Sequence, residues 1–234
     1  VASENRRIMA IMPLYIKTDS QGEFIIDWSW ADAYHRNGLN YYPKLVSSIP
    51  FTPASGPRIL ITDAIRSKEI IEEISRALKQ ITEESDFSSV HILLANKDEI
   101  KDFSQEDFSL RTSYSFHWFN NHYLSFENFL QDMTSRQRKN IKKERKKIND
   151  QGVTVSRICG SEITLEMLET FYQFYQVTYL KRGMRGYLNF EFFKKIVDSI
   201  PETIMLVLAK NNSGEYVAGA LNFFDDEKLY GRYW

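Results

Sequence analysis

Acidic and aromatic side chains alternate in one short segment, Asp27-Trp28-Ser29-Trp30-Ala31-Asp32. Carboxylates beside indole rings can form a pocket that fixes an amine, and an apolar neighbour can raise the pKa of a carboxyl group until it accepts a proton at neutral pH. Ordinary packing of the rings in a core explains the same residues. The segment therefore predicts either a substrate pocket or a piece of hydrophobic core.

Two further residue types have spacing that suits chemistry. Arg58 follows Gly56-Pro57 in the proline-rich segment of residues 50–58, and a rigid loop that fixes an arginine suits a carboxylate or pyrophosphate ligand. The alternative is an ordinary arginine at the entry of a strand. His117 lies within Phe116-His117-Trp118-Phe119, where it offers a titratable group at the end of a predicted strand.

The most unusual feature is a basic run at residues 136–147, which holds eight Lys or Arg and one Glu. The whole chain has a net charge of −1, so the remainder, with 22 basic and 30 acidic residues, carries −8. Like charges four residues apart destabilise a helix, which disfavours a merely solvated face. The run predicts a strip that binds phosphates of nucleic acid, of a nucleotide-linked substrate or of lipid headgroups.

Several classes of function are excluded by what the sequence lacks. The four histidines have no i, i+4 pair and there is one cysteine, so no metal site is expected. GxSxG, GxxxxGK[ST] and GxGxxG motifs are absent. We interpret His91 as structural, because it lies in an apolar strand. The single Cys159 and the lack of a signal peptide or of a long apolar run predict a cytoplasmic protein.

Periodicity and turn residues predict a mixed succession of strands and helices. Strands are expected over residues 8–17 and 23–28, as a hairpin, and over residues 44–49, 90–95, 114–119, 153–158, 204–209, 216–224 and 228–234. Helices are expected over residues 30–37, 67–81, 125–150, 164–181 and 190–199. The chain begins without Met and ends within a strand, from which we expect further segments at both ends.

Seven motifs spread along the chain resemble those of one family: DWSWADAY, YYPKL, PFTPASGPR, FHWFN, SRQRKNIKKERKKI, GALNFF and LYGRYW. They are similar to motifs of the FemAB-like family of predicted N-acyltransferases of peptidoglycan biosynthesis or recognition. The resemblance implies an α/β (mixed α+β) fold with two GNAT-like acyltransferase halves joined by a long basic helix. The halves would be residues 1–124 and 153–234, with the connecting helix at residues 125–152.

The same resemblance implies transfer of an acyl or aminoacyl group to an amine, possible donors being acyl-CoA and aminoacyl-tRNA, with no tightly bound cofactor. The acyl-CoA signature of GNAT enzymes is absent; the nearest segment, residues 157–162, fails at its last position. This departure and the basic run favour a tRNA or nucleotide-diphosphate substrate. Asp32 or His117 would accept the proton. Substrate binding would fall to Asp27, Trp30, Lys44, Arg58, Arg136, Arg138, Lys139, Arg145 and Arg232.

Two other functions stay open. The chain would be a non-catalytic module that recognises peptidoglycan fragments, or a protein that binds nucleic acid or an anionic membrane surface through the basic run. A steep fall of affinity with salt distinguishes the last of these, because each phosphate contact releases about one counterion. The sequence does not predict the oligomeric state.

Overall fold

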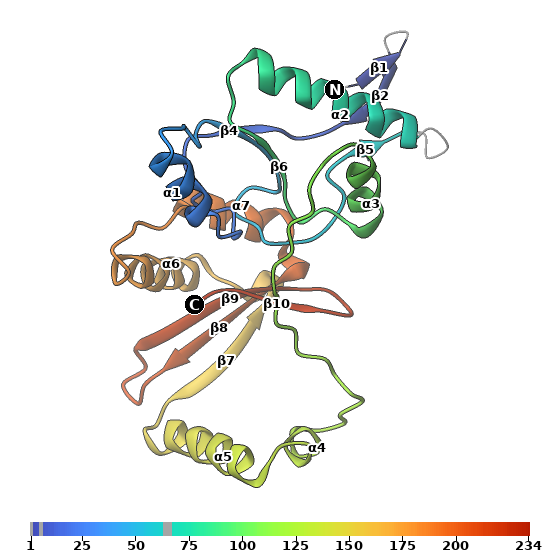
Figure 1. Cartoon of the computed structure of the whole chain (residues 1–234). Helices are drawn as coiled ribbons and strands as arrows, with labels where there is room; N and C mark the ends of the chain where they lie inside the picture. Colours follow the sequence, from blue (N-terminus) through green and yellow to red (C-terminus); the bar gives the residue numbers. More distant parts are fainter. Residues whose placement is uncertain (1, 5–6, 63–66) are drawn as a thin grey trace. The chain divides into compact units, whose positions relative to one another are not determined.

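The computed structural model describes residues 2–4, 7–62 and 67–234 (Figure 1). Its chain forms two compact units, Val1–His117 and Trp118–Trp234, which are described separately below. Both units combine helices with sheets. The predicted mixed α/β class is therefore confirmed.

The described residues of the first unit form two small sheets and three helices. One sheet has the antiparallel order β1 (Ala2–Glu4), β2 (Arg7–Ile11) and β5 (Leu60–Ile61). The other has the order β3 (Tyr15–Lys17), β4 (Lys44–Ser47) and β6 (Val90–Ile92), in which β4 runs antiparallel to β3 and parallel to β6. The helices are α1 (Trp28–Arg36), α2 (Ser67–Glu84) and α3 (Lys97–Gln105).

Packing in the first unit follows the apolar spacing of α2. Ile70, Ile71 and Leu78 are buried along one face of this helix, together with Ala10 of β2 and Phe103 of α3. All four residues of β4 are buried as well, two of them polar, so that strand lies within the unit rather than at its surface. The polar side chains of Lys44 and Ser47 therefore lie in the interior of the unit.

The second unit is a four-stranded antiparallel sheet with helices. The sheet order is β10 (Leu229–Tyr233), β9 (Tyr216–Phe224), β8 (Ile204–Lys210) and β7 (Thr154–Cys159). The helices are α4 (Phe126–Gln131), α5 (Ser135–Asp150), α6 (Leu165–Leu180) and α7 (Phe190–Ser199), with 3-10 turns η2 (Gly160–Glu162) and η3 (Pro201–Thr203). Phe171, Tyr175 and Phe193 pack with Leu206 and Leu221 in its core.

Four predicted elements are wrong. The predicted strand of residues 8–17 is interrupted at residues 12–14 and forms β2 and β3, which belong to different sheets, so it makes no hairpin with residues 23–28. Residues 23–27 form no strand and Trp28 begins α1 instead, because the side chains of Glu23 and Asp27 turn inward to Lys44 while β3 pairs with β4. Residues 114–119 are irregular and largely exposed, and no described strand pairs with them. The predicted helix of residues 125–150 is two helices, because Thr134 caps a new one through Gln137. Helix α3 was missed.

Candidate functional site

A buried lysine lies at the centre of a charged cluster in the first unit. Lys44, the first residue of β4, has a fully buried side chain. Its Nζ donates hydrogen bonds to Ser20 Oγ at 2.9 Å, Glu23 Oε2 at 2.9 Å and Asp27 Oδ2 at 2.5 Å. All three protons of the ammonium group are used, so Lys44 holds together the segments before β4.

The two carboxylates of this cluster respond differently to burial. Burial raises the pKa of Glu23, and its ion pair with Lys44 only partly opposes this. Burial also acts upward on Asp27, but the hydrogen bonds from Lys44 and Tyr41 together hold its pKa below the usual value. Glu23 Oε1 and Asp27 Oδ1 are buried and accept no hydrogen bond from a described residue. Asp27 is therefore the ionised partner of Lys44, and Glu23 is the one more easily protonated.

A chain of side chains leads from this cluster to the surface. Tyr41 Oη donates to Asp27 Oδ2 at 2.8 Å and lies 3.5 Å from His91 Nε2, which is also 2.9 Å from Ser89 Oγ. Burial lowers the pKa of His91 to about 4, so its imidazole is neutral at pH 7. A neutral imidazole of such low pKa accepts a hydrogen bond but holds a proton only weakly.

The series of contacting side chains ends at the surface with Trp30, whose ring is covered by the guanidinium of Arg111. Trp30 of α1 has a ring centroid 6.4 Å from that of His91 and is 46% exposed. The Arg111 guanidinium lies over the Trp30 ring, 4.6 Å from its centroid. A ring that carries a cation on its face can hold an anionic or planar group.

The structure brings together only part of the predicted proton and substrate residues of the first unit. Asp27 and Lys44 meet in the cluster, and Trp30 lies at its outer end. Asp32 is exposed on α1 and forms an ion pair with Arg36 at 3.0 Å. His117 is exposed in the irregular segment. Sequence reasoning did not assign Ser20, Glu23, Tyr41 or Arg111 to a site and took His91 as structural.

Arg58 is buried in a separate part of the first unit. Its guanidinium donates to the carbonyl oxygens of Leu93 at 2.7 Å, Leu94 at 3.0 Å and Ala54 at 2.6 Å. The Glu99 carboxylate accepts hydrogen bonds from the backbone N–H of Arg58, at 2.8 Å, and of Ile59. Burial lowers the pKa of Arg58. Arg58 thus ties the proline-rich loop to the end of β6.

The basic run lies on α5, in the second unit. Arg136, Lys139 and Arg145 are exposed and Arg138 is half-buried. None of the Lys and Arg side chains of α5 forms a salt bridge with a described residue, and the first turn holds no acidic residue. This helix carries dense positive charge and, besides Glu144 and Asp150, no acidic residue, which favours binding of an anion.

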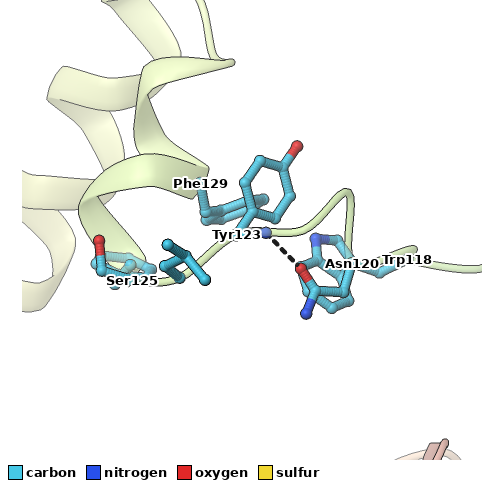
Figure 2. A pocket seen from close by; sticks show the side chains of 7 residues that line it. Trp118, Asn120, Tyr123, Ser125 and Phe129 are labelled. Atoms are coloured by element: carbon cyan, nitrogen blue, oxygen red, sulfur yellow. Dashed lines mark hydrogen bonds between the residues drawn. The ribbon is translucent and has the colours of Figure 1, made fainter.

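An aromatic cavity of about 370 Å³ lies beside α4 (Figure 2). It is lined by Trp118, Asn120, Tyr123, Leu124, Ser125, Phe126 and Phe129. The ring centroids of Trp118 and Tyr123 are 6.1 Å apart, and that of Phe129 is 5.8 Å from Trp118. Sequence reasoning missed this cavity, although its rings surround the start of a predicted helix.

Two charged residues contact side chains that line the cavity. The Arg145 guanidinium of α5 is 4.3 Å from the centroid of the Phe126 ring. Tyr123 Oη donates to Asp132 Oδ2 at 2.6 Å, and this hydrogen bond raises the pKa of Tyr123. Arg145, predicted to bind an anion, therefore contacts a ring that lines the cavity.

Arg232 lies on β10 in the same unit, with its guanidinium 4.6 Å from the centroid of the Tyr233 ring. Within the described ranges, no three His, Cys, Asp or Glu side chains gather as a metal site would require. The described helices include none with the length and apolar character of a membrane span.

Comparisons with known proteins give one family. A family model named FemAB-like, with the description peptidoglycan biosynthesis/recognition, matches residues 1–234. No curated protein matches the chain. A similar solved structure is that of L-PGS from Bacillus licheniformis, with 12% identity and a TM-score of 0.45. The similarity covers 83% of this chain and 54% of that one, so this chain spans about half the length of that relative.

Proposed function

The chain belongs to the FemAB-like family, as its motifs predict, and we propose that it is an N-acyltransferase. In this proposal an acyl or aminoacyl group passes to an amine, with a peptidoglycan precursor as the acceptor. The observation that carries it is the family match over residues 1–234, whose description includes peptidoglycan biosynthesis.

The proposed architecture is a pair of GNAT-like halves, residues 1–124 and 153–234, connected through the basic segment of residues 125–152. GNAT-type sites lie where two parallel strands separate. In support, β4 and β6 of the first unit are parallel, with Val46 paired to His91. The chain of side chains from Lys44 to Trp30 starts from these two strands.

The proposed reaction needs a neutral amine, because an ammonium group has no lone pair. The amine nitrogen attacks the acyl carbon and its proton passes to a base; the bond to the donor then breaks, and CoA leaves as the thiolate or the tRNA 3′-oxygen leaves as the hydroxyl, with the proton returned by the base. We propose Asp32 or His117 as the base; burial lowers the pKa of His91 to about 4, which makes its imidazole too weak a base for this step. Backbone N–H groups would stabilise the oxyanion.

Both candidate donors, acyl-CoA and aminoacyl-tRNA, carry phosphates. We propose that Arg136, Arg138, Lys139 and Arg145 on α5 bind them, because no described carboxylate neutralises this helix. Lys44 and Arg58 would support the site from within the first unit, since their donors already bind protein oxygens. Arg232 remains a further proposed contact.

The test uses the full-length protein and two labelled donors, acetyl-CoA and an aminoacyl-tRNA, with a peptidoglycan stem peptide that has a free amine. Transfer of label to the peptide amine supports the proposal. Arg138→Glu with Lys142→Glu should weaken donor binding, whereas Lys194→Glu with Lys195→Glu on α7, an equal change of charge, should not. Absence of transfer from both donors, by protein that binds the stem peptide, contradicts the proposal.

The second candidate function is recognition of peptidoglycan without catalysis, because the family description includes recognition. Such a module would bind stem peptides with the same affinity in the presence and absence of donor. A third candidate, an anion binder through α5, would show affinity for nucleic acid or anionic vesicles that falls steeply with salt and no affinity for stem peptides.

A further inference from the structure

The cavity beside α4 is an open depression at the surface, whose lining residues Trp118 and Leu124 are 64% and 95% exposed. Its volume, about 370 Å³, lies in the range in which proteins bind ligands of a few rings. The rings of Trp118, Tyr123 and Phe129 face the space at mutual centroid distances of 5.5–6.1 Å. These rings offer flat faces and edges on which another planar ring can stack.

Two polar side chains that line the cavity, Asn120 and Ser125, are held in position by hydrogen bonds. Asn120 Oδ1 accepts a hydrogen bond from the Tyr123 backbone N–H at 2.8 Å, which orients the amide and directs its nitrogen elsewhere (Figure 2). Ser125 Oγ lies at the opposite side of the lining and contacts Asn128. An oriented amide beside aromatic rings suits the hydrogen-bonding edge of a heterocycle.

Positive charge adjoins the same cavity. Arg145 lies over Phe126, one of the lining rings, at 4.3 Å. Arg138 and Lys142 precede Arg145 by seven and three residues, so they share its side of α5. No described carboxylate pairs with any of the three. A ring that lines the cavity thus contacts one of three cations on the same side of α5, none of which forms a salt bridge with a described carboxylate.

We propose that this cavity is a nucleotide site, in which the base stacks against Trp118 and Tyr123 and the phosphates lie on Arg145 and its neighbours. An uncharged apolar ligand would use the rings but not the cations, and free phosphate would use the cations but not the rings. A base joined to phosphate uses both. The source of the nucleotide rests on the proposed function, because CoA and the 3′ end of tRNA both carry an adenine nucleotide.

The first experiment measures binding of ADP and of adenosine to the full-length protein by calorimetry, without acceptor or turnover. We expect Trp118→Ala to weaken ADP binding about 5- to 150-fold, the loss of one base–aromatic stack, and Trp118→Phe to retain most of the affinity. Arg145→Gln should weaken ADP more than adenosine. The matched controls are Tyr230→Leu, another exposed ring of this unit, and Lys195→Gln, which should leave the affinity unchanged.

The proposal is overturned if neither ADP nor adenosine binds, or if Trp118→Ala and Arg145→Gln bind ADP like the unaltered protein. It is also overturned if these two variants impair binding to anionic vesicles but not to ADP. To identify the source of the nucleotide, binding of CoA and of a short RNA that ends in CCA is measured with the unaltered protein and with Trp118→Ala. The source is the ligand whose affinity Trp118→Ala reduces more. If the protein binds ADP through Trp118 but transfers no acyl group, the nucleotide site is supported and the proposed acyltransferase function is contradicted.

Discussion

Replacing Lys44 by Met tests the reasoning about the buried cluster most directly. Methionine keeps much of the volume of the lysine stem but removes the cation and its three hydrogen bonds. Glu23 and Asp27, both nearly fully buried, would then face each other without a counter-charge. Breaking a buried ion pair on one side costs about 3–5 kcal/mol. That is a large share of the roughly 5–15 kcal/mol by which a domain is stable.

The pH dependence of this loss has a definite sign. Without Lys44, burial and mutual repulsion raise the folded-state pKa of both carboxyl groups above their unfolded values. Groups with raised pKa contribute stability below the unfolded pKa and lose it as the pH rises through the folded pKa. Lys44→Met should therefore cost least below about pH 4, near the unfolded pKa values of Asp and Glu, and progressively more toward neutral pH.

The assay is denaturant unfolding of the full-length protein from pH 3 to pH 8, read through probes in the first unit. Lys79→Met is the matched control, because Lys79 pairs with Asp107 at 3.2 Å where both side chains are exposed. Exposed pairs contribute about 0–1 kcal/mol. Adding Glu23→Gln and Asp27→Asn to Lys44→Met should restore much of the loss. The reasoning is refuted if Lys44→Met costs no more than Lys79→Met at neutral pH.

Three further predictions concern single residues. Burial lowers the pKa of His91 to about 4, so the stability that it contributes is complete above about pH 6.5 and is lost as the pH falls toward 4. His91→Gln should remove this contribution to the pH dependence of the free energy of unfolding. NMR titration of the imidazole checks the pKa. Glu99→Ala leaves the backbone N–H groups of Arg58 and Ile59 unpaired, and should cost at least about 2 kcal/mol in denaturant unfolding. In the second unit, Gly186→Ala should lower the unfolding temperature, because the added Cβ would lie 2.4 Å from Tyr175 Cε1; an unchanged midpoint would contradict the close packing there.

Elements set by local signals were predictable from the sequence. Helix α7 has the predicted bounds, with Asn189 as its N-cap, and α2 follows the spacing of its isoleucines. Strand β9 also has the predicted bounds, because turns with Asn211 and Asp225 on either side mark its ends. Each of these signals lies within a few residues of the element it defines.

Elements that failed were decided by distant partners or by a neglected cap. The alternation at residues 23–28 favours a strand, but contacts of Glu23 and Asp27 with Lys44, 21 and 17 residues away, outweigh it. Residues 114–119 have strand composition without a described neighbour to pair with. The break before α5 was visible, because Thr134 and Gln137 have the spacing of a capping box, yet the continuous basic run concealed it.

The same distinction between local signals and distant partners applies to the residues of the candidate site. A cation in a sequence is equally suited to a ligand or to the protein's own oxygens, and only the fold decides. Lys44 and Arg58 are satisfied within the first unit by groups that lie up to 36 residues away in sequence, which no local pattern reports. Arg145 differs in that no described carboxylate forms a salt bridge with it and its guanidinium lies over the Phe126 ring, so its predicted role in binding an anion stays a prediction. Variants in α5 should change binding before stability, and variants at Lys44 should change stability before binding.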